Sequence, residues 1–206
     1  MKVLAIARLF SGLADSALKG SWNPKGVPAF AKLIEGLHAD HNINLRTVLF
    51  CRDPDDRFHE IITWHTEASG DLVLIPYKRP TRGHFRKVDR VATEIFHILI
   101  SIYFFLKFRP QMVYSSFAMT LSASLFARYT NARTVLRFMG INPPHRAIAD
   151  GYGNRVIAWA LNAPFDMVVA SEDGSDPSRI IDKLIANDTP RIIRMNGCDL
   201  PVFVEE

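Results

Sequence analysis

Short aliphatic runs and longer amphipathic runs alternate along this chain. Runs of β-branched and aliphatic residues, typical of buried strands, occupy 2–8, 44–52, 60–66, 71–77, 111–116, 132–138, 166–171 and 191–195. Helical periodicity occupies 26–40, 83–108, 118–129 and about 150–163. A last helix is predicted to start at Asp176, which can cap it, with Pro177 at the favoured first position.

The order of these segments predicts the fold class. Strands that alternate with helices form βαβ units around a mostly parallel sheet. No internal repeat or linker-like stretch interrupts the chain, so we expect one α/β domain with a single Rossmann-like, doubly wound sheet. In such sheets ligands bind outside the carboxyl ends of the strands. The residues that follow strands are therefore the first candidates for function.

Composition and charge narrow the class further. The 206 residues suit one domain over 1–206, and 48% hydrophobic residues suffice for a sizeable core. The net charge of +4 (25 basic minus 21 acidic residues) is too mild to indicate nucleic acid. Cys51 and Cys198 form no C-x-x-C pair, which favours a reduced, cytoplasmic compartment. The longest apolar run, 95–106, is shorter than the ~18–20 residues that span a bilayer, so we expect a soluble or peripheral protein.

A long loop over 11–30 follows the first predicted strand. Loops longer than about 12–15 residues inside compact domains are usually functional or disordered. Gly26, at the start of the next predicted helix, would leave backbone N–H groups over the sheet edge, where they suit a phosphate. The spacing matches neither G-x-G-x-x-G nor the P-loop, which disfavours an unrelated nucleotide-binding Rossmann protein. A mobile surface loop is the plain alternative.

The stretch 135–147 also follows a predicted strand. Arg137, Gly140 and His145 are expected near the same crevice. Arginine offers a fixed fork of donors for phosphate or carboxylate, and histidine acts near neutral pH. A solvated or structural role is the alternative for His145.

Basic residues crowd the stretch 78–90, in which six of thirteen residues are Lys or Arg. Arg82, His84, Arg86 and Lys87 are candidates for contact with an acceptor or a membrane, because a basic helix start that leads into an apolar helix can dock on an anionic bilayer. The competing interpretation is a solvated helix end followed by a helix buried against the sheet. For the apolar half the buried interpretation is favoured, since doubly wound sheets need such helices.

Two acidic clusters, 53–56 and 171–177, carry an Asp-x-Asp pattern and several carboxylates. Both are also what turns and helix caps look like. No His or Cys spacing indicates zinc. We predict no metal site.

Several stretches together resemble family 4 of the GT-B glycosyltransferases. The likeness rests on the strand order, the loop after the first strand, and the stretches RPQMVYSSFAMTLSASLFARYTNARTVLRFMGI, DMVVASEDGSDPSRIIDKL and RIIRMNGCDLPVF. The residues that match the family's motifs are Pro110, Val113, Tyr114, Asp166, Val168, Ser171, Asn196, Gly197, Asp199 and Phe203.

The resemblance implies the N-terminal, acceptor-binding half of a two-domain enzyme, with 199–206 as the start of the crossover to an absent C-terminal, donor-binding domain. It implies transfer of a sugar from a nucleotide-sugar, with retention and without a metal or cofactor, to a glycan or lipid-linked acceptor that the basic cluster marks as anionic. This places the enzyme in the cytoplasm or on the inner face of the membrane. The piece by itself is expected to be inactive. A non-catalytic module that binds an acceptor, a membrane or a partner chain is the alternative.

The resemblance also implies site residues. The expected cleft residues are Ser115, Ser116, Gly140, Ser171, Glu172, Asn196 and Gly197, and Lys25 and Gly26 are expected at the donor phosphates. Met139-Gly140 stands where the family usually has His-Gly, so Arg137 and His145 are the candidates for a catalytic role.

Overall fold

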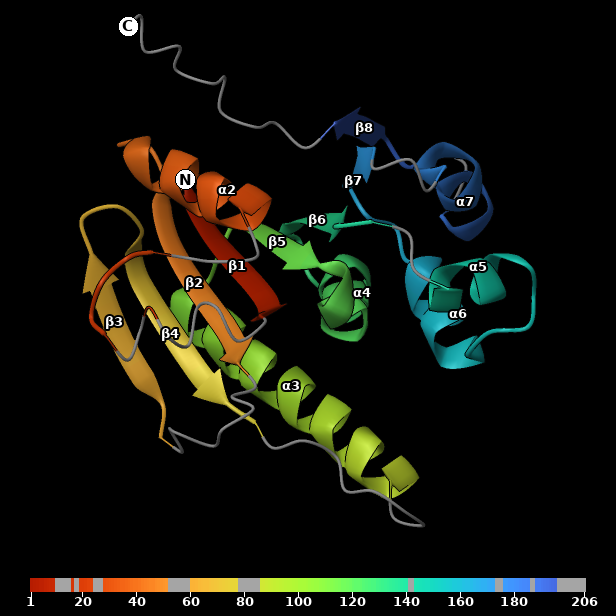
Figure 1. Ribbon diagram of the computed structural model, residues 1–206, viewed down its shortest axis with the longest axis horizontal. Coiled ribbons are helices and arrows are strands. Elements are labelled where there is room, and N and C mark those ends of the chain that lie inside the picture. Colours follow the sequence, from red (N-terminus) through yellow and green to blue (C-terminus); the bar gives the residue numbers. More distant parts are fainter. Residues whose placement is uncertain are drawn as a thin grey trace, which may run out of the picture.

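A computed structural model describes residues 1–9, 16, 19–23, 28–51, 60–77, 86–140, 143–172, 176–185 and 188–195. Their strands form an eight-stranded sheet in the order β3-β4-β2-β1-β5-β6-β7-β8 (Figure 1). The strands are β1 (Lys2–Leu9), β2 (Asn44–Cys51), β3 (Ile62–Thr66), β4 (Gly70–Pro76), β5 (Met112–Ser116), β6 (Arg133–Phe138), β7 (Met167–Glu172) and β8 (Arg191–Met195).

All neighbouring strands are parallel except β3, which pairs antiparallel with β4. The predicted α/β fold with a Rossmann-like, mostly parallel sheet is confirmed. The helices are α2 (Pro28–Ala39), α3 (Arg86–Phe108), α4 (Thr120–Tyr129), α5 (Pro143–Ala149), α6 (Arg155–Leu161) and α7 (Pro177–Leu184), with a 3-10 turn, η1, over Phe117–Met119.

The helices cover both faces of the sheet (Figure 1). On one face, Phe30 and Ile34 of α2 pack on alternate residues of β1, β2, β4 and β5. On the other face, α3 and α4 pack on the intervening residues, such as Leu4 and Ile6 of β1. α5, α6 and α7 join that second face over β6 and β7. β1 lies at the centre of the sheet, and Val3 to Ala7 are fully buried.

Two local predictions need correction. Asp176 does not cap α7 with its side chain, because it adopts a left-handed conformation (φ 56°, ψ 57°), which Asp tolerates better than most residues. Pro177 does occupy the first turn, as predicted. In place of the one helix predicted over about 150–163, the chain forms two short helices: α5, which begins earlier, at Pro143, and includes His145, and then α6.

The prediction that the apolar half of α3 is buried is also wrong in part. Phe104 and His97 are buried against the sheet, but Val91, Ile95, Leu99 and other large hydrophobic residues of α3 are exposed. By length and composition alone the helix Lys87–Phe108 is long and apolar enough to cross a membrane, and 17% of its most apolar 18-residue window is buried. The continuous apolar run 95–106 is shorter than the apolar part of this helix, because charged residues interrupt the apolar positions before Ile95.

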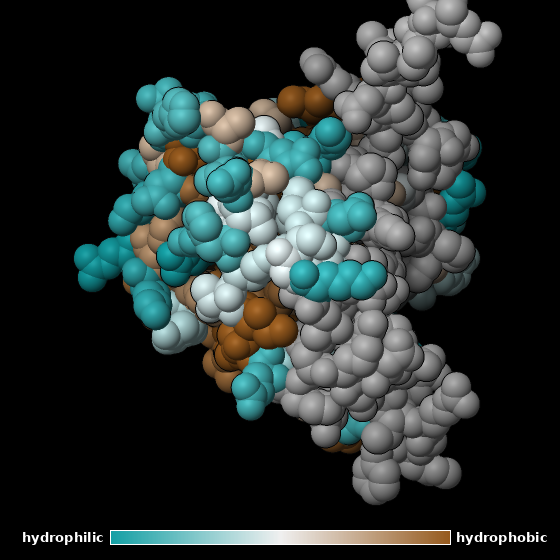
Figure 2. All heavy atoms as spheres, turned by 60° about the vertical axis from the view of Figure 1, so that its left-hand side comes forward, coloured by the Kyte–Doolittle hydropathy of each residue, from teal (hydrophilic) through white to brown (hydrophobic). Residues whose placement is uncertain are grey.

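Figure 2 shows the molecule with the β3 side of Figure 1 turned forward. Hydrophilic residues cover much of the described surface there, and hydrophobic side chains gather in a patch toward its lower edge. Apolar surface is therefore not spread evenly over this face.

Candidate functional site

The strand order switches sides between β1 and β5. From β1 it proceeds through β2 to β4 and β3 on one side, and from β5 through β6 and β7 to β8 on the other. Ligands of open α/β sheets bind at the carboxyl ends of the strands at such a switch point. The carboxyl edge at β1, β5 and β6 is therefore the first place to look for a site.

A hollow of about 450 Å³ lies at this edge, on the face that α3 and α4 cover. β1 contributes Arg8 to its lining and α3 contributes Glu94, while Phe117 follows directly on β5. α5 and α6 close the remaining side. The hollow thus collects residues from segments that are distant in sequence, as ligand sites of this fold do.

Arg8 is the principal cation of the hollow. Its Nη2 donates to Oε1 of Glu94, and both side chains remain partly accessible. The Nε of Arg8 is buried and has no hydrogen-bond partner in the structure. The Asn154 side chain, by contrast, accepts from the backbone N–H groups of Val156 and Ile157 and so caps α6. Arg8 therefore retains donor capacity for an anion.

His97 lies one helical turn after Glu94 and next to Arg8. It is 1% exposed, and its ring packs edge-on against Phe50 and Tyr77, with centroid distances of 4.4 and 4.7 Å. Burial, and secondly the positive charge of Arg8, lower the pKa of His97 to about 3. Neither ring nitrogen has a hydrogen-bond partner in the structure. His97 is thus a neutral aromatic wall behind the Arg8–Glu94 pair.

Arg137 lies at the same edge, on the face that α2 covers. Its Nη1 donates to the phenol oxygen of Tyr114 on β5 at 3.2 Å. Burial raises the pKa of Tyr114, while the charge and hydrogen bond of Arg137 oppose that rise, so the phenol is neutral at pH 7. Among the described residues no carboxylate pairs with Arg137, and its buried Nε has no partner. A half-buried cation with one neutral partner suits a phosphate or carboxylate ligand.

Ser115 and Ser116 end β5, and both are buried. Ser115 Oγ donates to the carbonyl of Ser116, whereas Ser116 Oγ has no partner in the structure. Ser116 stands in register with Arg137 on the neighbouring strand, so their side chains share one face. A buried hydroxyl without a partner is costly, and a ligand at this edge would satisfy it.

His145 lies beside this edge but does not open onto it. It is 2% exposed, and its ring contacts Phe117 and Phe138 at centroid distances of 3.8 and 5.5 Å. Burial lowers its pKa to about 4, so it is neutral at pH 7. The structure thus places His145 in an aromatic cluster under the hollow, and its catalytic role stays a prediction.

The other predicted cleft residues divide into two groups. Gly140, just after β6, is buried with a left-handed φ of 128°, and Ser171 is buried near the end of β7, whose last residue is Glu172. Asn196, Gly197, Lys25, Gly26, Arg82 and His84 lie outside the described residues. For Arg86 the structure describes only its place as the first residue of α3, and Lys87 is exposed.

Arg8, Glu94 and His97 are the site residues that sequence reasoning missed. Arg8 carried a signal, because it is the charged residue that ends the apolar run of the first strand, at the carboxyl edge. Glu94 and His97 carried no such signal, since the sequence predicts that the apolar residues of their helix, and not these two, face the sheet.

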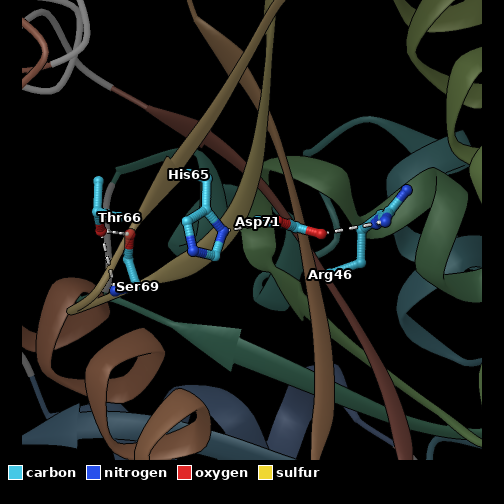
Figure 3. Close-up of polar contacts among 5 residues, drawn as sticks. All are labelled: Arg46, His65, Thr66, Ser69 and Asp71. Carbon is cyan, nitrogen blue, oxygen red and sulfur yellow. Dashed lines mark hydrogen bonds and ion pairs between the residues drawn. The ribbon is translucent and has the colours of Figure 1, made fainter.

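A second polar cluster lies at the opposite edge of the sheet (Figure 3). Asp71, at the start of β4, contacts Nδ1 of His65 at 2.8 Å and a guanidinium nitrogen of Arg46 at 3.3 Å. Thr66 and Ser69 bond to each other in the adjoining turn. The cluster sits at the amino ends of β2 and β4, away from the edge where this fold binds ligands, and it stabilises the β3–β4 hairpin.

No three His, Cys, Asp or Glu side chains of the described ranges gather as metal ligands would. The 53–56 cluster lies outside those ranges, and of the 171–177 cluster only the ends are described.

Comparison with solved structures supports the fold. No family model matches this sequence, and no curated protein matches it. One structure of sucrose-phosphate synthase from Thermosynechococcus elongatus aligns with a TM-score of 0.56 and 9% identity, over 97% of this chain and 91% of that one. A second structure of that enzyme aligns with a TM-score of 0.57 and 8% identity, over 94% of this chain and 47% of that one.

The chain therefore spans about half the length of the second structure, 47% of it. Sucrose-phosphate synthase is a GT-B glycosyltransferase, so this chain has the Rossmann-like α/β fold found in that class. Identity this low establishes a likeness of fold alone.

Proposed function

We propose that this chain is the acceptor-binding, N-terminal domain of a retaining glycosyltransferase of family 4 type. A second Rossmann-like domain would bind most of the nucleotide-sugar, and the reaction would take place between the two. The glycosyltransferase-like fold supports this proposal. Family 4, retention of configuration, and an anionic or lipid-linked acceptor come from the sequence resemblance.

One observation carries the proposal. Arg137 lies at the carboxyl end of β6, where it donates to the Tyr114 phenol and has no carboxylate partner among the described residues. The hydroxyl of Ser116, which has no partner, lies beside it on the neighbouring strand. Cations and hydroxyls preorganised in this way stabilise the negative charge that develops on a leaving diphosphate. Arg8, at the end of β1, offers a second cation on the other face of the same edge.

The first test is binding of nucleoside diphosphates to the full chain, measured by calorimetry across UDP, GDP and ADP. We expect Arg137→Gln to weaken the binding of the preferred diphosphate by about tenfold or more, because a charge-assisted hydrogen bond contributes roughly 1.5–3 kcal/mol. Ser116→Ala should weaken it by less. Arg133→Gln is the matched control, since Arg133 is exposed on the same strand and face but at the amino edge.

Equal binding by wild type and Arg137→Gln would overturn the assignment of this edge to the donor phosphates. The second test is transfer itself. We expect the chain alone to transfer no sugar when it is supplied with nucleotide-sugars. Sugar transfer without a second domain would contradict the proposal that most of the donor binds there. A chain that binds no diphosphate at all would likewise overturn the assignment of this edge and leave the donor phosphates to the second domain.

A further inference from the structure

The outward side of α3 is apolar along its whole length. Seven of the fourteen exposed large hydrophobic residues among the described ranges lie on this helix. Six of them, between 51% and 65% exposed, follow one another at steps of three or four residues and form what we call the α3 stripe: Val88, Val91, Ile95, Leu99, Tyr103 and Leu106. At 1.5 Å per residue the stripe extends for about 27 Å.

The outward side of α3 differs from that of a surface helix of a soluble domain. Such a helix turns its apolar side to the core and its polar side to water. In α3 the fully buried positions include His97 and Ser101, whose hydroxyl donates to the carbonyl of His97. The aliphatic side chains of the stripe point the other way. Packing on the sheet accounts for residues such as Phe104 but does not explain the hydrophobicity of the stripe.

The charges around the stripe have one sign. Exposed Lys87 and Arg90 flank its amino-terminal end, and exposed Lys107 flanks its other end. The two acids of the helix, Asp89 and Glu94, are half-buried, and Glu94 is paired with Arg8. The exposed residues of α3 are thus apolar or cationic, without a carboxylate. This combination suits a surface that is negatively charged outside and apolar beneath.

Self-association fits this pattern poorly. Two copies that met stripe to stripe would bring Lys87, Arg90 and Lys107 of one copy against cations of the other, with no exposed acid of α3 to pair them. An anionic membrane surface, by contrast, attracts all of these cations at once.

We propose that α3 docks this chain on an anionic lipid bilayer, lying in the plane of the membrane with the stripe inserted among the acyl chains and Lys87, Arg90 and Lys107 at the headgroups. A hollow of about 520 Å³ beside the stripe, lined by Leu106, Arg109 and Thr130 among others, lies within reach of a headgroup. This inference does not depend on the proposed function, because a chain without transferase activity would bind vesicles in the same way.

The experiment is flotation of the full chain with vesicles of phosphatidylcholine that contain rising fractions of phosphatidylglycerol. We expect binding to rise with the anionic fraction and to fall with salt. The Ile95→Glu, Leu99→Asp double variant should lose binding, whereas Ile61→Glu and Val156→Asp, which change exposed hydrophobic residues outside α3, should keep it. Lys87→Gln with Arg90→Gln should weaken binding about thirtyfold, since each cation near an anionic surface contributes about 1 kcal/mol. Arg155→Gln, an exposed cation on α6, is its control.

Insertion is checked directly with Leu99→Trp. Its added fluorescence should shift to the blue and be quenched by brominated lipid tails, and that of Ile61→Trp should not. Sedimentation without lipid tests the rival occupant, a second copy of the chain. The proposal would be overturned if wild type dimerised without lipid and the Ile95→Glu, Leu99→Asp variant did not. Equal vesicle binding by that variant and wild type would also overturn it. All variants sit at exposed positions, and circular dichroism verifies that each is folded.

Discussion

The guanidinium of Arg8 contacts the carboxylate of Glu94, and this pair joins the carboxyl end of the central strand to the helix that covers it. Both residues line the hollow at the switch point of the sheet. The pair thus connects the core of the fold with the candidate site, and its two members carry opposite charges toward any ligand there.

Removing each charge should therefore have opposite effects on anion binding. Arg8→Gln should weaken the binding of inorganic pyrophosphate several-fold, because it removes the cation of the hollow. Glu94→Gln should strengthen it, because it leaves Arg8 without a competing carboxylate. In a double-mutant cycle on the free energy of unfolding, we expect a coupling of about 0.5–1 kcal/mol, as for partly exposed pairs. Equal losses of pyrophosphate binding in both single variants would reduce the pair to a structural contact.

The two buried histidines predict how stability depends on pH. Burial lowers the pKa of His97 to about 3 and that of His145 to about 4, below the unfolded value of 6.5. Below pH 6.5 the unfolded chain therefore binds more protons than the folded one, and the free energy of unfolding falls as the pH falls toward 4. Each histidine contributes a slope of about 1.4 kcal/mol per pH unit in that range.

Denaturant unfolding at pH 7, 6 and 5 measures this slope. His145→Phe and His97→Phe should each make the loss of stability between pH 6 and pH 5 smaller. His65→Gln is the control, because the His65 side chain is exposed at the far edge of the sheet. An unchanged slope in both Phe variants would show that other groups govern the acid sensitivity.

Gly153, in the lining of the hollow, has no room for a side chain. A Cβ there would come within 2.2 Å of Ile148 Cγ1 and 2.6 Å of the Ile148 backbone. Gly153→Ala should therefore push α5 away from α6 and cost about 1–3 kcal/mol of stability. Gly36→Ala, on α2 with open space around it, should instead stabilise by about 0.5–1 kcal/mol. Thermal unfolding of the two variants checks both signs, and a Gly153→Ala protein as stable as wild type would show that α5 gives way freely.

Local pattern was sufficient for the sheet, because each strand is a short aliphatic run between polar segments. It also placed Arg137 and Ser116 at the carboxyl ends of neighbouring strands, since that placement needs only strand boundaries. It failed for α3, where periodicity reveals an apolar side but not which way that side faces. Because the orientation of α3 was predicted wrongly, Glu94 and His97 were not predicted as site residues. His145 was located correctly along the chain but not in space, because the aromatic rings of Phe117 and Phe138 that enclose it come from other elements.

The position of β1 between β2 and β5 has a consequence for the order of folding. Val3 pairs with Met112, and the backbone N–H of Lys2 donates to the side chain of Gln111, a contact that spans 109 residues. The β1–β2 and β2–β4 pairings span much shorter separations. Because contacts distant in sequence form slowly, we expect β1, β2, β4 and β3 to associate first and β5 to join them late. On the ribosome, about a hundred residues would then be synthesised after β1 before its second neighbour, β5, exists. The late β1–β5 pairing is also the one along which the candidate site lies.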